Sequence, residues 1–212
     1  MKFLRDNGLT IALTLAFLLT LIGMAVSGWS AYNEELAEHG RAGIGLLAYL
    51  GSGDFISALF ENWESEFLQM AAYVILTAYL FQRGSAESRD PDGGDEEEER
   101  RRPLKAPGMS SVGRFLYAYS LGIALALLFV FSFGLHLSGS LDAANEEALL
   151  HGGEVKSVAA YIAEPRFWFE SFQNWQSEFL STAVLVVLSI FLRFRGSPES
   201  KPVNAPHKQT GT

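Results

Sequence analysis

The residues best suited to chemistry form two short polar sets that recur 112 residues apart. Each set holds an amide, a hydroxyl and a carboxylate at helical spacings of three and four, so its members share one helix face. Oxygen ligands of this kind suit a proton or a hard cation such as Ca²⁺, Mg²⁺ or Mn²⁺. If the two helices meet, the sets form one candidate polar or ion site of Asn62, Ser65, Glu66, Asn174, Ser177 and Glu178.

A second group of candidate ligands is the segment Asn-Glu-Glu-x-x-x-His, which also occurs twice. Imidazole and carboxylate bind transition metals, and two copies would supply two histidines to one ion. The spacing is not a specific zinc motif, and a solvated acidic turn is the alternative interpretation. The candidate metal ligands are Glu34, Glu35, His39, Glu146, Glu147 and His151.

Both groups belong to an internal duplication. Without a gap, about 30 of the 78 positions from 11 to 88 are identical to the residue 112 positions later. The longest match pairs FENWESEFL at 60–68 with FQNWQSEFL at 172–180. Aromatic residues at helical spacing form a stripe on another face of this motif, and we interpret them as interfacial anchors. They are Phe60, Trp63, Phe67, Phe172, Trp175 and Phe179. In the alternative to an ion site, both motif glutamates simply reach water and both asparagines bond nearby backbone.

Composition favours a membrane protein. Hydrophobic residues make up 49% of the chain and charged residues 19%, which leaves too little polar surface for a soluble domain. Cysteine is absent, so disulfides and thiolate chemistry are excluded. The net charge of −8 argues against nucleic acid as a partner. Because no phosphate loop or nucleophile elbow occurs, we expect no enzyme activity, no catalytic residues and no cofactor.

The hydrophobic runs predict an all-α polytopic membrane protein with four transmembrane helices. Residues 8–32 and 115–141 carry no charge and are long enough to cross about 30 Å of hydrocarbon. A cleaved signal peptide is the alternative for the first run, but its internal counterpart argues against it. The apolar run 67–82 spans only about 24 Å, so that helix must include the duplicated motif. We expect Asp54 to be its N-cap and Pro165 to begin its counterpart.

Lysine and arginine counts predict the orientation. Thirteen of these residues lie on the side that holds both termini and the linker, against three on the other. Both termini are therefore expected in the cytoplasm, with the two repeats parallel about an axis along the membrane normal. The opposite, acidic side would attract cations.

The predicted domains follow the duplication. Residues 1–83 and 114–195 are the two-helix membrane repeats. Residues 84–113 are a cytoplasmic linker with an acidic and a basic run, and residues 196–212 are a cytoplasmic tail; both are predicted to be disordered because they are polar and densely charged. Glycines at 23, 28, 134 and 139 are expected where helices approach closely.

The motif Asn-Trp-Glu/Gln-Ser-Glu-Phe-Leu, together with the boundary QRGSAES at 82–88, resembles a family of small bacterial integral membrane proteins grouped as a domain of unknown function. The resemblance covers the chain from Phe3 to Ser200 and implies a four-span protein of the bacterial inner membrane. It implies no activity.

The residues favour a small channel- or transporter-like protein for a cation or proton. The alternative is a non-transporting accessory, sensory or structural membrane subunit. A bundle this small encloses little by itself, so the expected partners are the lipid bilayer and a second copy or another membrane protein.

Overall fold

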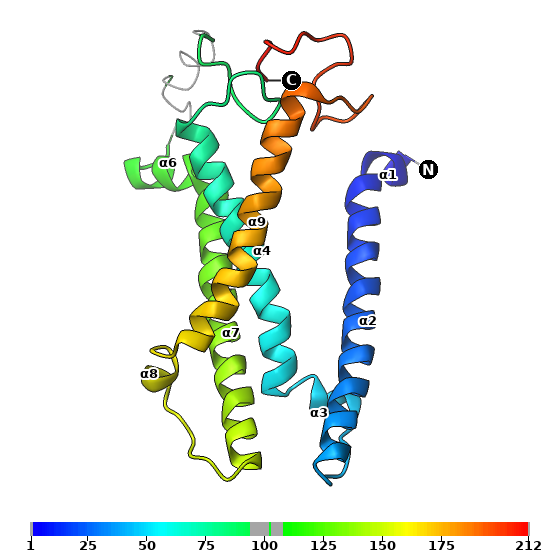
Figure 1. Ribbon diagram of the computed structural model, residues 1–212. Helices are drawn as coiled ribbons and strands as arrows, with labels where there is room; N and C mark the ends of the chain where they lie inside the picture. Colours follow the sequence, from blue (N-terminus) through cyan, green and yellow to red (C-terminus); the bar gives the residue numbers. More distant parts are fainter. Residues whose placement is uncertain (1, 94–101, 103–107, 212) are drawn as a thin grey trace. The chain divides into compact units, whose positions relative to one another are not determined.

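The computed structural model describes residues 2–93, 102 and 108–211, and this part of the chain is helical without a strand (Figure 1). The predicted all-α fold is confirmed. The glutamate run of the predicted linker lies outside the described residues. The helices are α1 (Lys2–Asp6), α2 (Gly8–Glu38), α3 (Leu46–Tyr49), α4 (Gly53–Tyr79), α6 (Ser111–Ala118), α7 (Ser120–Leu150), α8 (Val158–Tyr161) and α9 (Pro165–Phe191).

Two of the described helices, α2 and α7, are long and apolar enough to cross a membrane. Each has 31 residues, about 46 Å at 1.5 Å per residue, which exceeds the hydrocarbon thickness. Both continue past the predicted apolar runs because the following residues are mostly glutamate, alanine and leucine, which favour helix.

The long helices recur with equal lengths. α4 and α9 both have 27 residues, and α2 and α7 both have 31. Within each pair, the second helix begins 112 residues after the first. α9 begins at Pro165, as predicted, but Asp54 is not the N-cap of α4. The Ser52 hydroxyl instead accepts a hydrogen bond from the Phe55 amide at 3.2 Å, and Asp54 lies in the first turn, where a negative charge complements the helix dipole.

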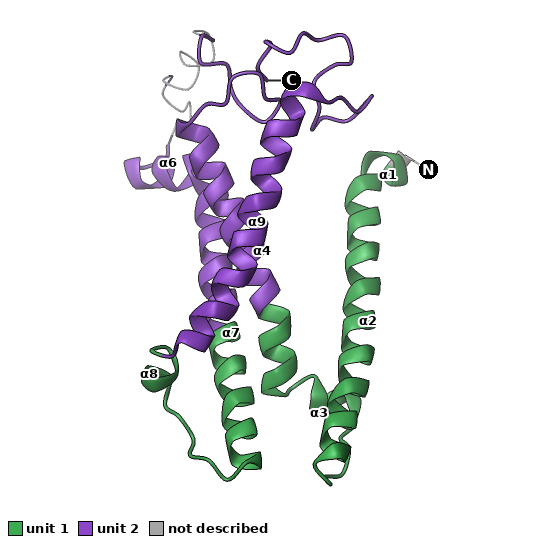
Figure 2. Ribbon diagram, viewed as in Figure 1, with its two compact units in different colours: residues 1–60, 135–163 green, residues 61–134, 164–212 purple. Residues whose placement is uncertain are grey.

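The chain forms two compact units (Figure 2). Unit 1 comprises residues 1–60 and 135–163, and unit 2 comprises residues 61–134 and 164–212. Each unit therefore takes residues from both predicted repeats.

Two buried tyrosines organise unit 1. Tyr49 packs against Gly28 of α2, where a larger residue would collide with its ring. The hydroxyl of Tyr161 is hydrogen-bonded to that of Ser140 in α7. The two tyrosines are only 3% and 2% exposed. They contact α2 at position 28 and α7 at position 140, which are equivalent positions of the duplication.

Asparagine clamps hold the loops that follow α2 and α7. The Asn33 amide oxygen accepts from the Ile44 amide at 2.7 Å, and its nitrogen donates to the Ile44 carbonyl at 3.1 Å. Asn145 makes the same two bonds with Lys156, at the same distances. One asparagine side chain therefore fixes each loop to the helix that precedes it by two hydrogen bonds.

The start of α4 crosses α7 at two glycines of unit 1. A Cβ atom on Gly139 would lie 2.5 Å from the Ser57 amide nitrogen and 2.9 Å from the Gly53 carbonyl oxygen. Of the glycines expected at close approaches, 28 and 139 are at such contacts, whereas nothing lies within 4 Å of a Cβ on residue 23 or 134.

The segment from 196 to 211 differs from the predicted disordered tail, because it folds onto the turn at Gly84 within unit 2. The buried Lys201 ammonium donates to the carbonyl oxygens of Gly84, His207 and Gln209. The Gly211 amide also donates to the Ser85 carbonyl at 2.9 Å. Composition predicted solvated chain, but one lysine provides three hydrogen bonds that order it.

Candidate functional site

A line of polar side chains runs along the contact between α4 and α9 in unit 2, which we call the α4–α9 seam. On α4 the line is Glu61, Ser65, Gln69 and Tyr73, each four residues from the next and therefore on one helix face. Neighbouring positions are about 6 Å apart along the helix axis, and the whole line covers about 18 Å. The seam thus places polar groups along nearly half the length of α4.

At one end of the seam, two glutamates of α4 bond to α9. The Asn174 amide donates to the Glu61 carboxylate. The Trp175 indole nitrogen donates to Glu64 at 3.1 Å, and Glu64 is fully buried. A carboxyl group in such a place requires hydrogen-bond partners, because burial without them costs several kcal/mol.

An aromatic cluster surrounds Trp175, the hydrogen-bond partner of the buried Glu64. Trp175 packs against Phe129 and Phe133 of α7, with ring centroids 6.0 and 6.4 Å apart, and against Phe172 at 5.4 Å. Phe133 also contacts Phe167, which has no exposed surface. These rings hold the indole in the orientation that meets the glutamate.

The hydrogen bond between Trp175 and Glu64 is expected to stabilise unit 2 by about 1–2 kcal/mol. A double-mutant cycle with Trp175→Phe and Glu64→Met, read by thermal unfolding in detergent, measures this coupling. The matched control pairs Trp175→Phe with Gln176→Met, an exposed residue at the position equivalent to Glu64. Equal coupling in both cycles would contradict the assigned bond.

The middle of the seam contains the glutamates of the duplicated motif. Glu66 and Glu178 are close enough to interact electrostatically. One turn further, the Gln69 side-chain amide donates to the Thr182 hydroxyl, which in turn donates to the Glu178 carbonyl at 3.0 Å. In this part of the seam the hydrogen bond from Gln69 to Thr182 therefore joins the two helices.

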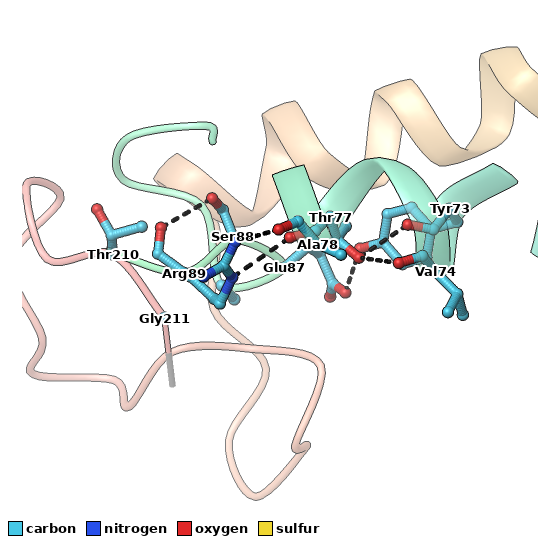
Figure 3. A pocket seen from close by; sticks show the side chains of 10 residues that line it. Tyr73, Val74, Thr77, Ala78, Glu87, Ser88, Arg89, Thr210 and Gly211 are labelled. Atoms are coloured by element: carbon cyan, nitrogen blue, oxygen red, sulfur yellow. Dashed lines mark hydrogen bonds between the residues drawn. The ribbon is translucent and has the colours of Figure 1, made fainter. Parts of the chain in front are cut away.

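At its other end the seam reaches another carboxylate, Glu87, in the turn after α4. The Tyr73 hydroxyl donates to Glu87 at 2.7 Å (Figure 3). Arg89 lies beside them and donates to the Ala78 carbonyl at 2.5 Å, which caps α4 with a positive charge. Burial raises the pKa of the Glu87 carboxyl; the Tyr73 hydrogen bond opposes this, and the nearby Glu199 carboxylate adds to it.

Two cavities open at Glu87. One of 640 Å³ is lined by Tyr73, Glu87 and Arg89 together with Thr210 (Figure 3). The other, of 320 Å³, is lined by Tyr73 and Glu87 and extends along the seam to Gln69 and Thr182. Water in these cavities would reach the seam at the Tyr73–Glu87 pair.

The raised pKa of Glu87 makes the stability of the folded protein depend on pH. The contribution of Glu87 to the free energy of unfolding is fully present below the ordinary glutamate pKa of 4.5, and it is lost as pH rises through the higher folded-state pKa. We expect Glu87→Gln to remove this loss when thermal unfolding is measured from pH 4.5 to 8.

Asp92 provides the matched control for this pH dependence. Its hydrogen bond to Arg83 lowers its pKa, so its contribution is lost only as pH falls below the ordinary value of 3.8. Asp92→Asn should leave the slope above pH 4.5 unchanged. An equal change in both variants would contradict the assignment to Glu87.

The predicted polar residues are divided by the structure. Asn174 and Glu178 are half-buried along the seam, and Glu66 lies near Glu178 with an exposed side chain. Asn62 and Ser177 are exposed as well. The buried Ser65 donates to the Asn62 carbonyl at 2.8 Å and so serves its own helix. The seam residues outside the predicted site are Glu61, Glu64, Gln69, Tyr73, Glu87 and Thr182.

Sequence offers a partial signal for the missed glutamates. Glu61 and Glu64 are replaced by glutamine at the equivalent positions 173 and 176, so both copies keep a side-chain oxygen there. Glu87 is identical to Glu199. Positions at which both copies keep a side chain able to form hydrogen bonds therefore identify more of the seam residues than positions with identical residues do.

The predicted aromatic anchors also differ in their surroundings. Phe172 and Phe179 are 56% and 42% exposed, as a lipid-facing residue would be, while Trp175 is part of the aromatic cluster. Phe60, Trp63 and Phe67 are half-buried.

The predicted metal ligands lie at the ends of α2 and α7 in unit 1. Tyr32 donates to the Glu146 carboxylate at 2.9 Å, and the rings of His39 and His151 are neighbours. Within the described ranges, no group of three or more histidine, aspartate or glutamate side chains is placed to hold a metal ion.

The family model for a domain of unknown function, DUF6766, matches residues 1–212. The chain belongs to this family. No curated protein and no solved structure matches it. Membership in a family of unknown function agrees with the resemblance of the motif, and the DUF6766 description assigns no activity, so function must be argued from the seam.

Proposed function

We propose that this DUF6766 protein is a four-span protein of the bacterial inner membrane that moves protons along the α4–α9 seam. The observation that carries the proposal is the row of polar side chains from Glu61 to Tyr73 on α4, which bonds to α9 at Asn174, Trp175 and Thr182 and ends at Glu87. Ionisable side chains within transmembrane helices are costly and mark ion or proton pathways.

The closed geometry of the seam favours a proton over a larger cation. Direct hydrogen bonds join Glu61 to Asn174 and Gln69 to Thr182, so a hydrated ion would have to separate the helices. A proton instead passes between carboxylates and bridging waters without widening the path. The cavities at Glu87 would connect the seam to water on one side.

Exposed apolar surface supports the membrane setting. Along α2, leucines 9, 13 and 19 are 75%, 62% and 70% exposed, and α7 exposes Leu127 and Val130 by more than 60%. Surfaces of this size are stable only against lipid or another helix. We therefore propose that lipid or a second copy of the chain covers α2, and chemical cross-linking in native membranes tests the second possibility.

Equivalent local contacts support the two-repeat architecture. Asn33 and Asn145 form identical clamps, and the turns at Gly84 and Gly196 have φ of +86° and +85°. Two spans in each repeat would give both repeats the same orientation, and the distribution of lysine and arginine supports a cytoplasmic location for both termini.

Single-cysteine labelling tests the four-span topology, since the chain has no cysteine of its own. With four spans, Met109→Cys is cytoplasmic and Glu154→Cys is outside. If only α2 and α7 cross the membrane, the two locations are exchanged: Met109→Cys is outside and Glu154→Cys is cytoplasmic. Labelling intact cells with a membrane-impermeant maleimide distinguishes the two topologies. Lys208→Cys, cytoplasmic in both, is the control for cell integrity.

Proton flux into liposomes tests the function. Purified protein should acidify vesicles under an imposed potential, and the double variant Glu66→Gln, Glu178→Gln should reduce the rate by about tenfold or more, since a positioned proton carrier contributes at least that factor. Tyr73→Phe should also slow flux because it breaks the bond to Glu87.

Glu154→Gln is the matched control, because this exposed carboxylate lies in the loop after α7 and belongs to unit 1, whereas the seam belongs to unit 2. Each variant's thermal stability is measured alongside its flux. Absence of flux in the wild type, or unchanged flux in the double variant, would overturn the proposal. The alternative is an accessory subunit in which the polar contacts only hold α4 against α9. In that case the wild type shows no flux, and the seam variants lose thermal stability.

A further inference from the structure

Two imidazole rings are neighbours at the ends of α2 and α7. Both helix ends belong to unit 1, which Figure 2 shows in green. The ring centroids of His39 and His151 are 5.6 Å apart, with the planes at 86°. Both rings are exposed and directly follow the last residue of their helices. The pair is therefore open to ions in solution.

Each ring has the hydrogen bond that prepares a histidine for metal binding. Nδ1 of His39 lies 2.9 Å from the Glu35 carbonyl, and Nδ1 of His151 lies 2.9 Å from the Glu147 carbonyl. A carbonyl only accepts, so each Nδ1 carries the proton and donates it. In the neutral tautomer the Nε2 lone pair is then available to a ligand, and such a backbone bond also orients the ring.

The separation of the rings matches a shared ion. Metal–nitrogen distances of about 2.0–2.1 Å at a tetrahedral angle place two imidazole centroids about 5.2 Å apart, within a few tenths of an ångström of the pair. The adjoining helix ends are acidic, with Glu34, Glu35, Glu146 and Glu147. Negative charge there raises the local cation concentration.

We propose that His39 and His151 together bind one divalent first-row transition metal, with water completing its coordination. Imidazole prefers copper, nickel and zinc, and affinity within this series is highest for Cu²⁺. The ion would join the end of α2 to the end of α7. This site is in unit 1 and is independent of the proposed seam function in unit 2.

Cu²⁺ titration of the full-length protein in detergent, purified with a tag that lacks histidine, tests the site. We expect one Cu²⁺ per chain, with nitrogen coupling from two imidazoles in the electron paramagnetic resonance spectrum. His39→Ala and His151→Ala should each weaken binding by at least tenfold. Addition of Cu²⁺ should raise the unfolding temperature of the wild type and of neither variant.

His207→Ala is the matched control, because this exposed histidine belongs to unit 2 and its Nδ1 bonds the Ile190 carbonyl at 3.1 Å. It should bind Cu²⁺ as the wild type does. Glu35→Gln and Glu147→Gln, which keep the backbone bonds, should weaken binding less than either histidine variant. Unchanged affinity in both histidine variants, coupling to a single nitrogen, or an equal loss in His207→Ala would overturn the proposal.

Discussion

Lys201→Met is expected to release residues 196–211 from the turn at Gly84, at a local cost of about 3 kcal/mol. Lys201 is 1% exposed and donates to three carbonyl oxygens that methionine leaves without that donor. Burial lowers the pKa of the Lys201 ammonium, and Arg193 adds to this, so the three carbonyls are what stabilise its charge. The carbonyls regain partners only when the segment opens to water.

Hydrogen exchange measures this release. The Gly84 amide donates to the Thr210 hydroxyl at 2.9 Å, and the Gly211 amide donates to the Ser85 carbonyl. Protection of both amides should fall about a hundredfold in Lys201→Met, which corresponds to 3 kcal/mol. Lys208→Met, an exposed lysine of the same segment, should leave protection unchanged. Equal protection in the Lys201 variant and the wild type would contradict the role of the ammonium.

Gly139→Ala is expected to destabilise unit 1 by about 1–3 kcal/mol, the usual cost of overpacking. The added Cβ would lie 2.5 Å from the Ser57 amide nitrogen and 2.9 Å from the Gly53 carbonyl. Both are backbone atoms of α4, so no side-chain rotation can relieve the overlap and the helices must separate.

Gly134→Ala provides a control with the opposite sign on the same helix. Nothing lies within 4 Å of its added Cβ, and alanine favours helix over glycine by roughly 0.5–1 kcal/mol. When both variants are unfolded thermally in the same detergent, the midpoint temperature should therefore fall for Gly139→Ala and rise for Gly134→Ala. A rise in both would show that α4 does not approach α7 at Gly139.

Local structure was largely predictable. The apolar runs and Pro165 indicated helices and one helix start, because hydrophobic periodicity and proline geometry act over neighbouring residues. Asp54 was wrongly expected to cap α4 because Ser52, two residues earlier, offers an equally good acceptor. Competition between adjacent capping residues depends on backbone geometry that composition does not express.

The order of the tail was not predictable from composition. Residues 196–211 are polar, and such segments usually lack enough apolar burial to offset the entropy of ordering. Lys201 changes this balance because its three partners come from Gly84 and from its own segment. A single long-range contact of this kind leaves no periodic signal in the sequence.

By itself, the sequence determined that two polar motifs 112 residues apart each carry an aromatic and a polar face on a helix. Helical periodicity sets the angle between side chains of one helix, but it does not set which face meets a neighbour. Only the tertiary structure decided that Glu64 is buried against Trp175 while Glu66 stays exposed, because the aromatic cluster with Phe133 determines how α9 presents its indole to α4.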